Sequence, residues 1–182
     1  SISVTEPLCN GQTGSAFATA SGGAGGPFNI CYTGGIFGVS VVCTNPVNGL
    51  TAGTYTCIAI DLSDGSLSAL EFDVDEPSQI IVLFRDLTKP TCIDSADGAI
   101  SISIIGGTAP TGYDINWSTG FSETDVLTSV LSNIEDGTYT ATITDDNACQ
   151  IIFEDSIHDP DPIVFNPLIN QINCFGFSDG SI

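Results

Sequence analysis

The chain has 182 residues, with only two Lys and Arg against 22 Asp and Glu, and a formal net charge of −20 at neutral pH. Such a surface repels nucleic-acid phosphates and anionic membrane headgroups, so both are poor partners. With 42% hydrophobic and 13% charged residues, the chain can build packed cores, and its richness in Thr, Ile and Val favours strands over disorder.

We expect any anchoring or export signal to lie outside these 182 residues. No apolar stretch approaches the roughly 18 residues of a membrane-spanning helix, and no signal peptide opens the sequence. Because Met is also absent, we expect an internal piece of a longer protein. Seven Cys without a CxxC pair indicate disulfides rather than zinc, and therefore an extracellular location.

The sequence repeats itself with a period of about 84 residues. The segment CNGQTGS (9–15) matches CIDSADGAI (92–100) and CFGFSDGSI (174–182), and AGTYTCIAID (52–61) matches DGTYTATITD (136–145). At this length, such a period predicts two small domains and the start of a third. We predict immunoglobulin-like repeats over 8–77 and 78–162. Residues 1–7 are the end of a preceding repeat or a first strand, and 163–182 are the first strands of a truncated third repeat.

Strand signals with a period of two follow one another along both repeats. The inward-facing positions that this alternation predicts are Tyr55, Cys57 and Ala59 in the first repeat, and Ile100, Ile102, Ile104, Tyr113, Ile115, Trp117, Tyr139, Ala141 and Ile143 in the second. Short strands between turn signals, without a helical period, predict an all-β fold of tandem antiparallel β-sandwiches in an extended array.

A Gly-Thr-Tyr step opens the matching strand in both repeats. Tyr55 and Tyr139 in these steps resemble the tyrosine corner of immunoglobulin domains, whose hydroxyl bonds to nearby backbone. Trp117 is then the core aromatic residue of the second repeat, and Tyr32 takes its place in the first.

Each joint between repeats carries an acidic residue followed by Pro. The joints are Glu6-Pro7, Glu76-Pro77 and Asp159-Pro160-Asp161-Pro162. Because Pro restricts its own backbone and that of the residue before it, these joints are expected to be stiff and extended. The alternative is that Pro simply ends a strand.

In the second repeat, Cys92 precedes the first landmark strand and Cys149 follows the Gly-Thr-Tyr strand. They are the only Cys of that repeat, so we predict a bond between them, worth about 4 kcal/mol in the chain-entropy model.

The first repeat has four Cys, which allow three pairings. The alternation turns Cys31 outward and Cys57 inward. This favours Cys31 with Cys43 and Cys9 with Cys57. Cys174 is left over, and we expect its partner beyond residue 182.

No arrangement of residues predicts catalysis. His158 lies in a joint rather than a pocket, and the acids cluster in turns rather than in a cleft. The Gly-rich segment SGGAGGPF lacks the Lys and the following helix of a phosphate-binding loop.

Five side chains would share one end of the second repeat if Cys92 and Cys149 were bonded. They are Asp94, Asp97, Asp145, Asp146 and Asn147. Carboxylates so close repel unless a cation neutralises them, and Ca²⁺ takes six to eight oxygen ligands. The alternative is that these are solvated turn residues. A second candidate calcium site lies at the joint, formed by Asp159 and Asp161 with Glu154 and Asp155.

The order of these landmarks resembles the SprB repeat, found in tandem arrays in giant cell-surface adhesins of gliding bacteria. The second repeat supplies the motif with Cys92, Asp97-Gly98, Gly106-Gly107-Thr108, Pro110, Tyr113, Trp117-Ser118, Gly120, Gly137-Thr138-Tyr139, Asp145 and Cys149. The third fragment supplies Cys174, Asp179-Gly180 and Ile182. The first repeat departs from it with Thr13 in place of Asp, Tyr32 in place of Trp and three extra Cys, which leaves its disulfide scheme open.

The resemblance implies export by the type IX secretion system and a role at the cell surface in gliding motility. By analogy with that phylum, Ser95 and Ser156 stand in O-glycosylation patterns. Independently, Asn116 fits the N-glycosylation sequon.

We expect a non-catalytic stalk segment of a large secreted adhesin. Its expected partners are neighbouring repeats, surface polysaccharide or other cell-surface proteins. The alternative is an accessory module, or a sugar- or calcium-binding module, of a secreted polysaccharide-active enzyme.

Overall fold

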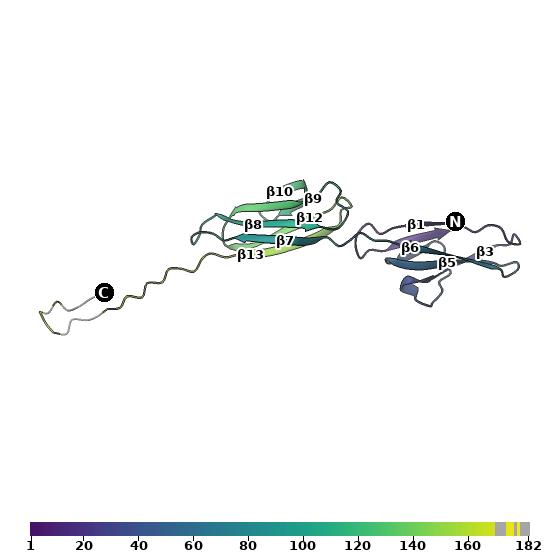
Figure 1. Ribbon diagram of the computed structural model, residues 1–182, viewed down its shortest axis with the longest axis horizontal. Helices are drawn as coiled ribbons and strands as arrows, with labels where there is room; N and C mark the ends of the chain where they lie inside the picture. Colours follow the sequence, from purple (N-terminus) through teal and green to yellow (C-terminus); the bar gives the residue numbers. More distant parts are fainter. Residues whose placement is uncertain (170–173, 177, 179–182) are drawn as a thin grey trace.

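The computed structural model describes residues 1–169, 174–176 and 178. Its strands form two β-sandwiches that lie end to end along the long axis (Figure 1). All strand pairs are antiparallel, and in the described residues the only helical segment is the short 3₁₀ turn η1 (Gly35–Phe37). The prediction of an all-β, immunoglobulin-like array is confirmed.

The first sandwich pairs two sheets of three strands. One sheet has the order β1-β2-β4 and the other β3-β5-β6. The strands are β1 (Ile2–Thr5), β2 (Gly14–Ala18), β3 (Phe28–Gly34), β4 (Val47–Leu50), β5 (Gly53–Asp61) and β6 (Leu67–Val74). Residues 2–5 pair with β2, so this segment is a first strand of the first sandwich.

The second sandwich pairs a sheet of three strands with one of four, in the orders β11-β8-β7 and β10-β9-β12-β13. The strands are β7 (Ile81–Thr88), β8 (Gly98–Ile105), β9 (Tyr113–Trp117), β10 (Ser122–Val126), β11 (Thr128–Ile134), β12 (Gly137–Thr144) and β13 (Gln150–Ile157). Neighbours in space are not always neighbours in sequence, because the chain crosses between the sheets from β8 to β9, from β10 to β11 and from β11 to β12.

Each sandwich has its own hydrophobic core. The Ile residues of β8 at positions 100, 102 and 104 are all buried, as their alternation predicts. Trp117 and Tyr32 are the central aromatic residues of the two cores, in agreement with the sequence. Packing of these inward faces against each other is what joins the two sheets of each sandwich.

Both Gly-Thr-Tyr steps build a tyrosine corner. The Tyr55 hydroxyl donates to the Thr51 carbonyl at 2.9 Å, and the Tyr139 hydroxyl donates to the Glu135 carbonyl at 3.0 Å. This confirms the tyrosine-corner prediction. The repeated sequence therefore encodes the same hydrogen bond, from the Tyr hydroxyl to a backbone carbonyl, at the start of β5 and of β12.

The described part of 163–182 contains no strand. Ile163 and Phe165 are 98% and 84% exposed, since the extended segment has no sheet to pair with. The strand expected at Asp179-Gly180 and Ile182 lies outside the described residues.

Candidate functional site

The two sandwiches are joined by a disulfide. Cys9, in the turn after β1, is bonded to Cys149, in the loop between β12 and β13, with their Cα atoms 5.6 Å apart. Cys9 also packs against the core of the second sandwich. The predicted bonds Cys92–Cys149 and Cys9–Cys57 are therefore wrong. Cys57 is buried and free, and Cys92 is exposed and free.

The direction of the strands explains why the predicted Cys92–Cys149 bond is wrong. Gly98, at the start of β8, lies against Ile157 at the end of β13, whereas Gly107, just after β8, lies against Asp145, just after β12. The strands β8 and β12 therefore run the same way. The loop before β8, with Cys92, and the loop after β12, with Cys149, lie at opposite ends, about 25 Å apart along eight strand residues.

Cys31 and Cys43 are bonded, which is the pairing that the alternation favoured. Cys31 is nevertheless buried, because the segment that leads to Cys43 returns beside β3, where Tyr32 pairs with Val42. Cys57 stays in the core as a free thiol. Burial raises the pKa of the Cys57 thiol, which keeps it protonated and unreactive.

Polar contacts reinforce the joint around the Cys9–Cys149 bond. The Glu76 carboxylate accepts a hydrogen bond from the Gly11 backbone N–H at 2.7 Å and from the Asn10 side-chain amide at 3.2 Å. The same Asn10 amide donates to the Pro77 carbonyl at 3.1 Å. From the other sandwich, the Asn147 amide donates to the Leu8 carbonyl at 3.1 Å. The first sandwich thus holds the Glu76-Pro77 segment through Asn10 and Gly11, and the second sandwich holds Leu8 through Asn147.

A cavity of about 390 Å³ lies beside this joint. It is lined by both sandwiches, with Asn10 and Gln12 from the first and Ile80, Gly107 and Gln150 from the second. A second cavity of similar volume lies in the first sandwich beside Cys57 and Asp61. No His, Lys or Arg side chain lines either cavity.

Asp145 and Asp61 bind loop backbone in the two sandwiches. The Asp145 carboxylate is buried and accepts from the backbone N–H groups of Thr108, Asn147 and Cys149 at 2.8, 3.0 and 2.9 Å. Each carboxylate oxygen thus has backbone donors and needs no cation.

Asp61 does the same with the backbone N–H groups of Ala24 and Ser63, both at 2.9 Å. The side-chain and backbone hydrogen bonds from Ser63, joined by the Ala24 N–H, hold the pKa of the Asp61 carboxyl below its usual range.

The five residues of the first calcium hypothesis do not gather. Asp145, Asp146 and Asn147 lie at the joint between the two sandwiches. Asp94 and Asp97 lie at the opposite end of the second sandwich. Asp97 accepts bonds from the Thr91 hydroxyl and backbone N–H, which lower the pKa of its carboxyl. Among the described residues, no group of three or more His, Cys, Asp or Glu is placed to hold a metal ion.

The second hypothetical calcium site is also dispersed. Asp155 is paired with Arg85, and the Asp159 carboxylate bonds to the Asp94 backbone instead. Glu154 and Asp155 are neighbours on β13, where successive side chains point to opposite faces. A single cation would therefore not meet both.

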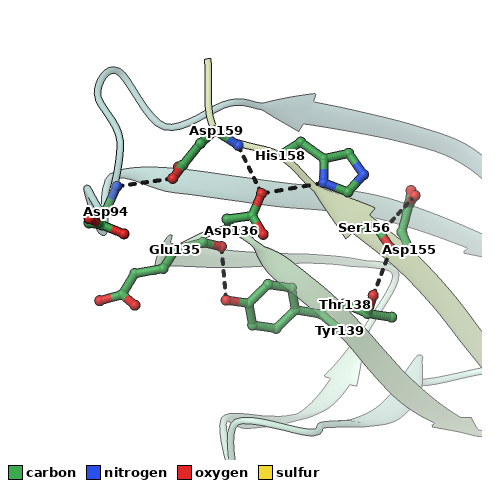
Figure 2. Close-up of polar contacts among 9 residues, drawn as sticks. All are labelled: Asp94, Glu135, Asp136, Thr138, Tyr139, Asp155, Ser156, His158 and Asp159. Carbon is green, nitrogen blue, oxygen red and sulfur yellow. Dashed lines mark hydrogen bonds and ion pairs between the residues drawn. The ribbon is translucent and has the colours of Figure 1, made fainter. Parts of the chain in front are cut away.

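Figure 2 shows the end of the second sandwich that lies away from the joint. The Asp159 Oδ2 atom accepts from the Asp94 backbone N–H at 3.0 Å, and the Asp159 N–H donates to Asp136 at 3.0 Å. Asp136 also lies 3.3 Å from His158 Nδ1. The other carboxylate oxygen of Asp159, Oδ1, is buried and has no hydrogen-bond partner among the described residues.

The predicted glycosylation residues occupy different settings. Ser156 lies on β13 with its hydroxyl 2.8 Å from that of Thr138 (Figure 2). Ser95 is half-buried in the turn after Cys92, and Asn116 is exposed on β9. Modification at these three positions stays a prediction.

No family model and no curated protein matches the chain. Among solved structures, it is similar to the three N-terminal domains of the bacteriophage RB49 highly immunogenic outer capsid protein, with a TM-score of 0.44 and 15% identity. That match covers 86% of this chain and 57% of the capsid protein chain. It is also similar to the amphioxus IgVJ-C2 molecule, with a TM-score of 0.30, 14% identity and coverage of 82% and 97%. The strand order given above carries the fold assignment.

Two further findings bear on location. Two disulfides indicate an oxidising compartment outside the cytoplasm. In the described parts of the chain, no helix has the length and apolar character to cross a membrane.

Proposed function

We propose that this chain is a rigid, non-catalytic segment of the stalk of a secreted cell-surface adhesin, of the kind that the SprB-like landmarks suggest. The observation that carries the proposal is the Cys9–Cys149 bond, because it couples consecutive sandwiches directly. A flexible enzyme linker has no need for such a bond. A stalk does, because its reach depends on fixed angles between its units.

The composition supports the same role. A net charge of −20 keeps a long array soluble and resists collapse of one unit onto another. The proposed partners are neighbouring repeats of the same chain and, at the surface that the stalk reaches, polysaccharide or other cell-surface proteins. From the resemblance to the SprB repeat, we also propose export by the type IX secretion system and a part in gliding motility.

Small-angle X-ray scattering tests the rigid joint. We expect the wild-type chain to scatter as one elongated particle, with a narrow distribution of distances between the sandwiches. The variant C9S/C149S keeps both cores but loses the covalent link, so its distribution should broaden toward shorter distances.

The matched control is C31S/C43S, which removes the disulfide inside the first sandwich and should leave the angle between the sandwiches unchanged. A wild-type chain as flexible as C9S/C149S would contradict the proposal.

A further inference from the structure

The turn that contains Cys9 has a counterpart in the second sandwich. The Cys9 carbonyl accepts from the Gln12 backbone N–H at 3.1 Å, and the Cys92 carbonyl accepts from the Ser95 backbone N–H at 3.2 Å. Each Cys therefore opens a turn of the same hydrogen-bonded length.

The backbone after each Cys is also the same. The second residue after Cys9 is Gly11, with φ of 74°, and the second after Cys92 is Asp94, with φ of 58°. A positive φ at a residue other than Gly is uncommon, so the match is not a default conformation. Gly176, the second residue after Cys174, has φ of 85°.

Both turns are fastened to the chain that leaves their own sandwich. The Gly11 N–H donates to the Glu76 carboxylate at 2.7 Å, and the Asp94 N–H donates to the Asp159 carboxylate at 3.0 Å (Figure 2). Both acceptors stand immediately before a Pro, at the two joints. The acid-Pro pairs are therefore the anchors of the Cys turns.

The residues beneath the turns match as well. Pro7 and Pro90, each two positions before its Cys, are buried. A Cβ atom on Gly14 would lie 3.2 Å from Pro7 Cδ, and one on Gly98 would lie 3.3 Å from Pro90 Cδ. The end of the first sandwich that contacts the second thus has the same Cys turn, acidic anchor and buried Pro as the far end of the second sandwich.

The two ends differ in whether another sandwich covers them. The first is covered, with Cys9 bonded to Cys149 and Asn10 donating to Glu76. At the second, Cys92 is exposed, Ile93 stands in place of Asn10, and the buried Asp159 Oδ1 has no donor in the described residues.

We propose that this end of the second sandwich is a docking surface for a further sandwich of the same kind. Cys92 forms its covalent link, to the cysteine that the arriving sandwich carries in the loop between its last two strands, as Cys149 is carried here. The Cys92 thiol and that partner thiol lose two protons and two electrons in forming one S–S bond. A disulfide oxidant accepts the electrons and protons and is reduced to two thiols.

The segment after the second joint has the spacing of such a partner. Ile163 follows Asp159 at the same distance along the chain as Ile80 follows Glu76. Ile80 is 5% exposed in the second core, whereas Ile163 is 98% exposed and has no core to enter. The arriving sandwich is therefore expected to take Ile163 and the residues after it as its first strand.

The first test extends the protein. Residues 1–162 are followed by a second copy of residues 80–162, which reproduces the spacing of the existing joint, and the chain is refolded with oxidised glutathione. Disulfide mapping by mass spectrometry is expected to find Cys92 bonded to the added copy of Cys149. Labelling of Cys92 by a maleimide should fall at least tenfold relative to the original chain.

Two thiols serve as internal references in that experiment. Buried Cys57 should stay unlabelled in both chains, and the added copy of Cys92 should label fully. If Cys92 and the added Cys149 both stay reactive while the extended chain emits only as buried indole, so that both copies of Trp117 are folded in, the proposal is overturned.

The second test uses the existing chain and does not depend on the folding of an added unit. The variant N10I/G11D gives the Cys9 turn the two central residues of the Cys92 turn. If the two turns are equivalent, Cys9 and Cys149 still pair in the variant to the wild-type yield. Two free thiols at these positions in a folded variant would overturn the equivalence.

This inference rests on the proposed stalk function, because a row of sandwiches supplies the partner. The two can fail separately. Loss of the Cys92 bond in the extended chain leaves the rigid Cys9–Cys149 joint standing, whereas a flexible wild-type joint in the scattering experiment removes the stalk function whatever Cys92 does.

Discussion

At the scale of single residues, Asp61 and Asp145 show what the repeated landmarks do. Asp61 ends β5 and Asp145 follows β12, and each binds the backbone N–H just after a Gly-Gly pair, at Ala24 and at Thr108. The sequence identified the acid and the Gly pair as separate landmarks. Their contact could not be predicted, because it joins the loops after two strands that lie in opposite sheets.

Substitution of Gly107 tests this contact. Its φ is 63°, and a Cβ atom there would lie 2.6 Å from Asp145 Oδ2 and 2.7 Å from Ile80 Cγ1. We expect G107A to lower the free energy of unfolding by about 2–4 kcal/mol in urea, because backbone strain and displacement of the carboxylate add. The control G120A has a φ of 87° and open space around its Cβ, so it should cost only about 1 kcal/mol. Equal losses would show that the Asp145 contact contributes nothing.

Acid titration tests the equivalent carboxylate of the first sandwich. The bonds from Ser63 and Ala24 lower the pKa of Asp61 in the folded chain. Its stabilisation is therefore present above the unfolded pKa of about 3.9, and is lost as the pH falls through the lower folded pKa. D61N should be less stable than wild type at pH 6, and the difference should shrink at about pH 2. The control D114N removes an exposed carboxylate on β9 and should show a small difference at both pH values.

At the scale of elements, the sequence predicted strands well and their partners poorly. Alternation places Ile100, Ile115 and Ile143 inward, and all three are fully buried, because inward and outward positions are a local property of a strand. Which loops share an end depends on strand order and direction across the sandwich. The pairing of Cys92 with Cys149 failed for that reason, and the set of five calcium ligands failed with it.

Trp117 and Ser129 form a polar link between the two sheets of the second sandwich. The Trp117 indole N–H donates to the Ser129 hydroxyl at 3.0 Å, and that hydroxyl donates to Glu123. Both Trp117 and Ser129 are almost completely buried. S129A should therefore lower the free energy of unfolding by about 1–3 kcal/mol, since it leaves the indole N–H without an acceptor.

Trp117 is the single Trp, so its fluorescence in a urea titration reports on the second sandwich alone. S132A, an exposed position on the same strand, is the control and should change the midpoint little. If S129A unfolds at the same urea concentration as S132A, the link between the sheets is not stabilising.

At the scale of the whole molecule, the main feature is the large excess of negative charge. Among the described residues, the one Lys or Arg side chain paired with a carboxylate is Arg85, with Asp155, so most carboxylates repel one another through solvent. The repeat period predicted consecutive sandwiches of the same kind. It did not predict the bond between the sandwiches, because a pairing that crosses from one repeat to the next leaves no mark within a single repeat.

Salt should therefore stabilise the chain. Raising NaCl from about 10 to 500 mM shortens the Debye length from about 30 Å to a few ångströms and screens the repulsion among the carboxylates. We expect the melting temperature to rise by several degrees.

Calcium chloride and magnesium chloride at equal ionic strength should then raise the melting temperature by the same amount. A rise specific to Ca²⁺ at millimolar concentration would show a calcium site that the described carboxylates do not form.

The position of the Cys9–Cys149 bond also decides how the chain responds to being pulled. The bond closes a loop with a sequence separation of 140 residues, from a turn near the first residue to the last loop of the second sandwich. Tension applied at the two ends passes through β1, from Cys9 directly to Cys149, and on through β13, so it bypasses the strands from β2 to β12. Even if both sandwiches melted under load, the roughly 490 Å of chain between these residues would stay locked, so the segment could lengthen only before Cys9 and after Cys149.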